Sequence, residues 1–295
     1  MVKDGFIAGD NGSLKLSVML FPFYGQLNRK SITPLELINS FYSLGIRAVE
    51  PSMRWIKANR AAWRRIHAII ADFGMRYSCC DIVANLVGRN EKENKKTLDE
   101  VEKNVEFVKK NLNCSLVLVA GARPAEGMSN EYGRKVYGAQ LARLCEKLEK
   151  TGVTITMESY GMYPDFVAGI KHCRKVIACC GNDNLKFTFD NGNFVLGGDS
   201  PLSAYHRFKK IIEHVHIKDF CRCARSFPAA LKSMDGKTYR TCLIGEGEAE
   251  ASGCVRLLKH DKYPGWISLE VGVEGNPLAE VIRGVNLIKN NWREC

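Results

Sequence analysis

The amino-acid sequence predicts a single eight-stranded α/β barrel, and three observations favour this class. Short apolar runs alternate with helical patterns along the chain, and eight of these runs have the length and the β-branched or large apolar residues typical of buried parallel strands. No glycine-rich dinucleotide- or phosphate-binding motif follows the first run, which argues against a doubly wound open sheet. The length of 295 residues suits one barrel domain.

The eight runs are separated by segments long enough for one helix each. We expect strands near residues 15–22, 46–51, 76–81, 115–121, 153–159, 185–190, 212–217 and 266–271. Thr33, Pro34 and Glu36 have the residue types of a capping box at the start of the first helix. Gly45, Gly74, Gly152 and Gly181 precede strands and suit helix ends. This repeated unit predicts a parallel sheet with right-handed crossovers.

Domain boundaries and compartment follow from composition. Residues 1–13 are predicted to be a short flexible leader, and residues 14–295 a single barrel domain. No run approaches the ~20 apolar residues of a membrane span, and the N-terminus lacks the apolar stretch of a signal peptide. We therefore expect a cytoplasmic protein without a membrane partner. Its 12 cysteines are expected to be reduced thiols, and they lack zinc-ribbon spacing.

The chain is basic, with 43 Lys and Arg against 32 Asp and Glu, a net charge of +11. Such an excess could attract nucleic acid, anionic lipid or a small anionic substrate. The basic residues gather in predicted helices, for example at 57–65 and 95–110. We therefore interpret them chiefly as the solvated outer faces of barrel helices.

Ionisable side chains end four of the later strands. Because side chains alternate along a strand, each of these strands has one polar face. The residues sharing these faces are Thr154, Thr156 and Glu158; Lys186, Thr188 and Asp190; His214 and His216; and Ser268 and Glu270. The C-terminal strand ends carry the active sites of such barrels. We therefore expect Glu158, Asp190, His216 and Glu270 to converge at the barrel mouth.

Three converging carboxylates would repel one another and resist ionisation. A divalent cation removes that repulsion, and oxygen ligands with one imidazole suit Mn²⁺, Mg²⁺ or Co²⁺, with Zn²⁺ also acceptable. The alternative is that each group is an isolated buried polar side chain with its own hydrogen bonds.

Further polar residues stand near other strand ends. Glu50 and Asp81 end the second and third strands, where each could face the mouth or form a salt bridge with a loop cation. His214 lies one inward step below His216 and is more typical of a supporting group than of a ligand. Asp219 is a candidate for orienting that histidine or a loop.

Six stretches carry a resemblance to a known superfamily. In chain order they are GIRAVEPS, TITMESYG, KFTFDNGNF, HVHIKD, IGEGEAE and YPGWISLEVG. Their order and spacing resemble the xylose-isomerase-like sugar isomerase/epimerase superfamily over roughly residues 14–290. The resemblance implies one divalent metal ion held by Glu158, Asp190, His216 and Glu270, with vicinal oxygens of the substrate completing its coordination.

The resemblance also implies catalytic roles. Glu158 and Glu270 would be acid/base groups on opposite faces of a keto sugar, working through an enediolate. Arg222 matches a substrate-binding arginine of an epimerase subgroup, and Asn193 and Glu50 are further candidates for substrate contact. Two positions depart from the family pattern, because Asn193 stands where many members have His and Pro164 where that subgroup has Glu.

The function predicted first is therefore a metal-dependent sugar isomerase or epimerase acting on a small molecule. A dehydratase or lyase acting on an inosose, a keto sugar or a 3-keto-glycoside would use the same site. A nucleic-acid enzyme like endonuclease IV is disfavoured, because that enzyme needs several His ligands for its zinc cluster and the chain has only six His. A metal-free regulatory barrel is a further alternative, and homo-oligomerisation is left open.

Overall fold

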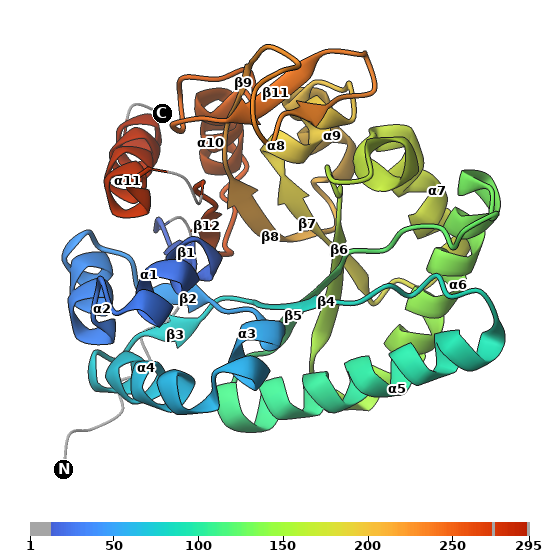
Figure 1. Ribbon diagram of the computed structural model, residues 1–295, viewed down its shortest axis with the longest axis horizontal. Coiled ribbons are helices and arrows are strands. Elements are labelled where there is room, and N and C mark those ends of the chain that lie inside the picture. Colours follow the sequence, from blue (N-terminus) through green and yellow to red (C-terminus); the bar gives the residue numbers. More distant parts are fainter. Residues whose placement is uncertain (1–12, 273–274, 294–295) are drawn as a thin grey trace.

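The computed structural model describes residues 13–272 and 275–293, and it shows a barrel of parallel strands ringed by helices (Figure 1). The barrel strands are β1 (Leu16–Met19), β2 (Ala48–Glu50), β3 (Arg76–Tyr77), β4 (Cys80–Val83), β5 (Leu116–Ala120), β6 (Thr154–Glu158), β7 (Leu185–Asp190), β8 (Ile212–Ile217) and β12 (Ile267–Leu269). They are hydrogen-bonded in the order β3-β2-β1-β12-β8-β7-β6-β5-β4. The predicted fold class is confirmed, with a strand at each of the eight expected places.

The third strand is divided in two, and this division lets the sheet close. β3 pairs with β2, whereas β4 pairs with β5 on the other side. Between the two pieces, the Ser78 N–H donates to the Val49 carbonyl at 3.1 Å and the Asp81 N–H to the Pro51 carbonyl at 2.9 Å. The ring of parallel strands is therefore nearly continuous, and the ends that carry the polar residues face one mouth.

Helices surround the strands. The longer ones are α2 (Pro34–Ser43), α4 (Arg60–Asp72), α5 (Glu91–Phe107), α6 (Asn130–Leu148), α7 (Ile170–Cys180), α9 (Pro201–Phe208), α10 (Ala251–His260) and α11 (Pro277–Arg293). Shorter segments are η1 (Phe21–Phe23), α1 (Tyr24–Arg29), α3 (Met53–Ala58), η2 (Val108–Leu112), η3 (Glu149–Thr151), η4 (Pro164–Ala168) and α8 (Asn191–Leu196). The predicted capping box of α2 is present, because the Thr33 hydroxyl accepts from the Glu36 N–H at 3.2 Å and the Glu36 carboxylate from the Thr33 N–H at 2.8 Å. At the end of α7, Gly181 has a φ of 59°, as expected of a C-terminal glycine.

The apolar core lies between the strands and the helix ring. Its strand members are the residues that alternate with the polar ones, including Met157, Phe187, Phe189, Val215, Ile217, Ile267 and Leu269. Each of these is 2% exposed or less. Because these residues face the helices, alternation directs their polar neighbours into the barrel lumen.

A small antiparallel sheet follows β8, and sequence analysis did not predict it. It comprises β9 (Phe220–Arg222), β10 (Leu231–Lys232) and β11 (Thr238–Thr241), in the order β10-β11-β9. Figure 1 shows β9 and β11 beside α8, beyond the ends of β7 and β8. Phe220 and Tyr239 pack with Val195, Leu196 and Ala249, so the sheet is attached to α8 and to the loop before α10.

The predicted leader falls almost wholly on residues 1–12, which lie outside the described residues. Within the described ranges, no helix has both the length and the apolar character needed to cross a membrane.

Candidate metal centre and substrate cavity

Three of the predicted ligands meet at the ends of adjacent strands. Glu158 ends β6, Asp190 ends β7, and His216 lies beside Asp190 in the register of β7 and β8. One ligand atom from each lies within 4.8 Å of the others. Their exposed fractions are 8%, 0% and 0%. Neighbouring strands of one parallel ring therefore place two carboxylates and an imidazole in a single buried cluster.

Glu270 joins this cluster from the other side. It follows β12, which pairs with β8. Nδ1 of His216 lies 3.5 Å from a Glu270 oxygen and 3.6 Å from a Glu158 oxygen. The structure thus brings together the four side chains that the sequence singled out as metal ligands.

Lys218 is a fifth member that sequence reasoning did not assign to the centre. Its Nζ lies 2.7 Å from an Asp190 oxygen and 2.9 Å from a Glu270 oxygen, with 7% of the residue exposed. Burial alone would lower the pKa of this lysine, but Asp190, Glu270 and Glu158 together raise it, so the ammonium stays charged. The sequence could have predicted this position, because Lys218 is two residues beyond His216 and alternation along the strand places both side chains on the same face.

The orientation of Asp190 is fixed by the helix that begins directly after this residue. It is the N-cap of α8, where its carboxylate accepts the Asn193 backbone N–H at 3.0 Å and the Asn193 side-chain amide at 2.6 Å. Burial raises the pKa of Asp190 to about 7, and Glu270 and Glu158 add to this effect while Lys218 opposes it. Asn193 also donates to the Ser159 carbonyl at 2.6 Å. Asn193 therefore fixes the orientation of Asp190, and its contact with substrate stays a prediction.

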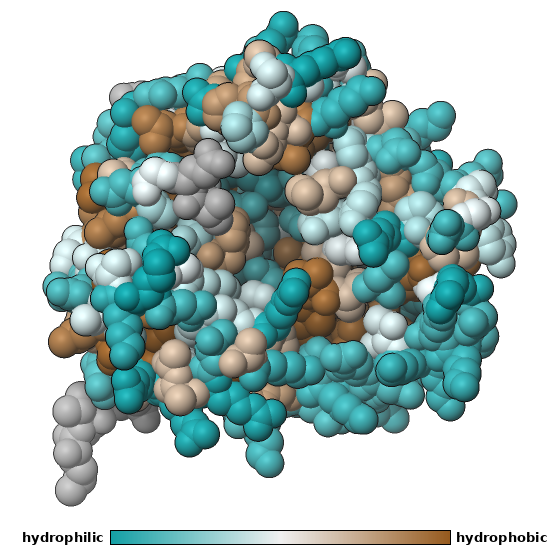
Figure 2. All heavy atoms as spheres, viewed as in Figure 1, coloured by the Kyte–Doolittle hydropathy of each residue, from teal (hydrophilic) through white to brown (hydrophobic). Residues whose placement is uncertain are grey.

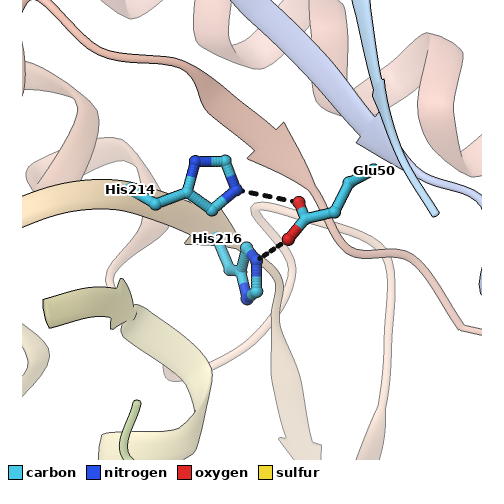
Figure 3. A group of neighbouring side chains, drawn as sticks. All are labelled: Glu50, His214 and His216. Carbon is cyan, nitrogen blue, oxygen red and sulfur yellow. Dashed lines mark hydrogen bonds and ion pairs between the residues drawn. The ribbon is translucent and has the colours of Figure 1, made fainter. Parts of the chain in front are cut away.

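Glu50 lies beneath the centre rather than in the mouth cavity. It is 1% exposed, and its two oxygens contact Nε2 of His214 at 2.8 Å and Nε2 of His216 at 3.0 Å (Figure 3). Burial alone would raise the pKa of Glu50, but the two histidines hold it well below its ordinary value. Because a carboxylate only accepts, each Nε2 donates, and the other nitrogen of His216 is left facing Glu158 and Glu270.

The residues present fit a divalent cation. Nδ1 of His216 is buried and has no hydrogen-bond partner among the described residues. It lies among carboxylates that come from three other strand ends. An imidazole nitrogen whose opposite N–H is bound by a carboxylate is a common arrangement of metal-ligating histidines. The donor set of oxygens with one imidazole suits Mn²⁺, Mg²⁺ or Co²⁺ and accommodates Zn²⁺.

Two further acidic candidates have supporting positions. Asp81 is 8% exposed and offers a ligand atom close to those of Glu50 and Cys79. Asp219 accepts the backbone N–H groups of three residues in the predicted Gly-Glu-Gly loop, namely Gly245 at 2.8 Å, Gly247 at 3.1 Å and Ala249 at 2.9 Å. Of the two roles expected for Asp219, these contacts support the orientation of a loop.

A cavity of about 460 Å³ opens at this centre, lined at its inner end by Glu158, Asn193, Lys218 and Glu270. Figure 2 shows a hollow with hydrophilic residues in the middle of the view. Arg222, the arginine expected to bind substrate, is not among the residues that line the cavity. Its side chain is 57% exposed and pairs with Glu248 at 2.7 Å. Arg240, on the neighbouring strand β11, lines the cavity instead.

Comparison with known proteins identifies the family of the chain. Residues 41–291 match the family model described as xylose isomerase-like TIM barrel. The chain belongs to this family. The resemblance inferred from the six sequence stretches is therefore confirmed.

Solved structures with the xylose isomerase-like barrel are similar over nearly the whole chain. The probable 3-DHS dehydratase AsbF from Bacillus anthracis has a TM-score of 0.73 at 14% identity, covering 94% of this chain and 99% of that one. The 3-keto-D-glucoside 4-epimerase YcjR from E. coli has a TM-score of 0.68 at 16% identity, covering 96% and 100%. The IOLI protein, solved with a bound zinc atom, has a TM-score of 0.67 at 16% identity, covering 95% and 96%. At these identities the likeness establishes the fold.

Among curated relatives, an inosose dehydratase from Lacticaseibacillus casei is 28% identical over 91 residues. The match spans 30% of this chain and 30% of that protein. The proteins similar to this chain therefore include both dehydratases and an epimerase.

Proposed function

We propose that this protein is a divalent-metal-dependent isomerase or epimerase that moves a proton next to the carbonyl of a sugar or sugar derivative. The observation that carries the proposal is the placement of Glu158 and Glu270. Both line the cavity, and both approach Nδ1 of His216, at 3.6 and 3.5 Å. They come from β6 and from the end of β12, which flank the β7–β8 pair in the sheet order. Two carboxylates can therefore serve two faces of one bound substrate.

Glu158, Asp190, His216 and Glu270 would hold the metal ion. When bound, the ion would polarise the substrate carbonyl and so make the neighbouring C–H bond more acidic. Mn²⁺, Mg²⁺ and Co²⁺ suit the oxygen-rich donor set, and the zinc atom in the IOLI structure supports Zn²⁺ as a fourth candidate.

The chain's own residues supply the proton transfers. One of the two carboxylates, Glu158 or Glu270, accepts the proton from carbon, and the other returns a proton. Return to the opposite face of the same carbon gives an epimer, and return to the adjacent carbon gives an isomer. The Lys218 ammonium lies at the cavity wall, where it can donate a hydrogen bond to the substrate oxygen that gains negative charge.

A dehydratase or lyase reaction is the second candidate, and Lys218 is the observation that favours it. After loss of the same proton, a hydroxyl on the next carbon leaves as water if it is protonated. The buried ammonium of Lys218, 2.9 Å from Glu270, can donate a hydrogen bond to that hydroxyl while the carboxyl that accepted the proton returns it. The matches to an inosose dehydratase and to a probable 3-DHS dehydratase support this reaction class.

The test is solvent exchange by the purified, metal-loaded protein. Keto sugars, inososes and 3-keto-glycosides are incubated in heavy water and followed by NMR. We expect deuterium at the carbon next to the carbonyl. Glu158→Gln and Glu270→Gln should each reduce the rate by about 10²–10⁴-fold, the usual contribution of a general acid or base. Ser159→Ala, which alters a neighbouring buried hydroxyl, is the control for general disturbance of the site.

The product separates the two candidates. A product of the same formula with exchanged deuterium supports the isomerase or epimerase, whereas loss of water supports the dehydratase. Turnover without exchange, with both Gln variants fully active, contradicts proton abstraction by these carboxylates.

A further inference from the structure

The cavity has two chemically different ends. At the inner end lie the carboxylates Glu158 and Glu270 with Lys218. The outer end is formed by β10, the segment that precedes it and β11, where Phe227 and Leu231 supply an apolar wall and Arg240 a cation. The Arg240 guanidinium lies 5.3 Å from the centroid of the Phe227 ring. A ligand that fills the cavity would therefore contact carboxylates at one end and an arginine on an aromatic ring at the other.

The two cations of the cavity differ in their partners. Lys218 is paired with Asp190 and Glu270. Arg240 donates to the Thr241 carbonyl at 3.3 Å, and within residues 13–272 and 275–293 it has no carboxylate partner. A guanidinium offers a planar fork of donors that matches carboxylate and phosphate groups. Among the described residues, Arg240 therefore has guanidinium donors that no carboxylate occupies, whereas Lys218 is already paired.

The small sheet places its two arginines on different faces, where they have different partners. In the antiparallel register of β9 and β11, Arg222 stands opposite Tyr239, and Arg240 opposite Cys221. Because directly opposed residues share a face and successive residues alternate, the two arginines project from opposite faces of the sheet. Glu248 neutralises Arg222 on one face, at 2.7 Å, whereas Arg240 faces the cavity.

We propose that Arg240 binds an acidic group, a carboxylate or a phosphate, that the substrate carries at the end remote from its reacting carbonyl. The orientation of the substrate in the cavity rests on the proposed function, which places the substrate carbonyl between Glu158 and Glu270. At the inner end, Lys218 is already paired with Asp190 and Glu270, and the ion would be held by four side chains, so among the described residues Arg240 is the cavity cation left for an acidic group. The apolar wall at Phe227 and Leu231 covers the carbon chain between its two ends. The substrate class is therefore an acidic keto sugar or a keto polyol acid.

The experiment compares three ligands that share one carbon skeleton: D-fructose, D-fructose 6-phosphate and D-fructuronate. The first is neutral, the second carries a phosphate and the third a carboxylate. Binding to the full chain loaded with Mn²⁺ is measured from the paramagnetic broadening of ligand proton signals, which requires no turnover. We expect at least one of the two acids to bind about tenfold or more tightly than D-fructose, the scale of one charge-assisted hydrogen-bond pair.

The variants assign the preference to one arginine. Arg240→Gln should remove the preference for the acid, and Arg240→Lys should retain part of it. Arg222→Gln should leave the preference intact, because that side chain is engaged by Glu248. Both arginines are exposed on the same small sheet, so the two Gln variants are matched in their effect on folding. A preference lost in Arg222→Gln and kept in Arg240→Gln overturns the proposal, as does equal or undetectable binding of both acids.

The result is separable from that of the proposed function. Acid-selective binding that depends on Arg240, without proton exchange at any substrate, supports the anion site and contradicts the proposed reaction. Proton exchange that depends on Glu158 and Glu270 but shows no acid preference supports the reaction and contradicts the anion site.

Discussion

The two halves of the barrel lumen share one backbone pattern and differ in chemistry. In the second half, β6, β7, β8 and β12 each have a polar residue inside the lumen and an ionisable one at or near the mouth. In the first half, the lumen side of β5 holds Leu118 and Ala120, which pack with Cys79. The main charged group of the first half, Glu50, reaches across to His214 and His216. In the proposed function, the second half would contact the ligand, and the first half would position those contacts.

The largest effect expected from this comparison is the loss of the metal when the second half loses a carboxylate. Asp190→Asn keeps an oxygen that can cap α8 but removes the negative charge. We expect metal affinity to fall by more than the 10–100-fold typical of residues that only support a ligand. Metal content after dialysis against a weak chelator measures this. Thr188→Val, one step deeper on the same strand, is the control, and full metal content in Asp190→Asn would contradict the assignment.

A smaller effect is expected in the first half. Glu50→Gln keeps one acceptor oxygen and turns an amide NH₂ toward the other imidazole N–H, so one of the two histidines loses its acceptor and the pair no longer fixes Nδ1 of His216. Metal affinity should fall by about 10–100-fold, with a weaker effect on folding. Asp81→Asn is the matched control. Burial, together with Glu50, raises the pKa of Asp81 well above its ordinary value, so an amide should change less at this position than at Glu50. Equal losses of metal affinity in Glu50→Gln and Asp81→Asn would contradict a specific positioning role for Glu50.

The smallest effect concerns a carboxylate of the second half that lies away from the mouth. Asp261 accepts from His260 at 2.9 Å, Lys209 at 2.9 Å and Tyr205 at 3.0 Å. These contacts, with His260 the largest, lower the pKa of Asp261 to about 2. Because the pKa in the folded state is depressed, the stabilisation is complete above about pH 4 and is lost as the pH falls toward 2.

Asp261→Asn should therefore reduce the free energy of unfolding by up to about 1 kcal/mol at pH 7, as expected of a surface ion pair. At pH 2.5 the difference from the unmodified chain should shrink. Urea denaturation at the two pH values measures both, and Asp235→Asn serves as a second exposed carboxylate whose pKa is lowered to about 2 by Lys237 and Ser233. A difference in the free energy of unfolding that grows on acidification would contradict this explanation.

Periodicity predicted the barrel because every strand buries an apolar face against helices. The same alternation predicted that Glu158, Asp190, His216 and Glu270 would meet, since parallel strands end at one mouth. Alternation could not show that Glu50 spans the lumen, because that contact joins β2 to β8 across the barrel. It also could not separate Arg222 from Arg240. The sequence predicted no strand within residues 220–241, and without a strand there is no face to assign.

The chain leaves the barrel before the small sheet and returns to it at the same place. Phe220 stands opposite Thr241, and the Cys242 N–H donates to the Asp219 carbonyl at 3.2 Å. A segment whose ends are held together in this way can be lengthened, shortened or replaced without moving the strands on either side of it. The residues proposed to hold the ion and the arginine proposed to bind the acidic group could therefore diverge independently. Grafting the 221–240 segment of another family member onto this scaffold is a direct route to altered selectivity with the reaction centre unchanged.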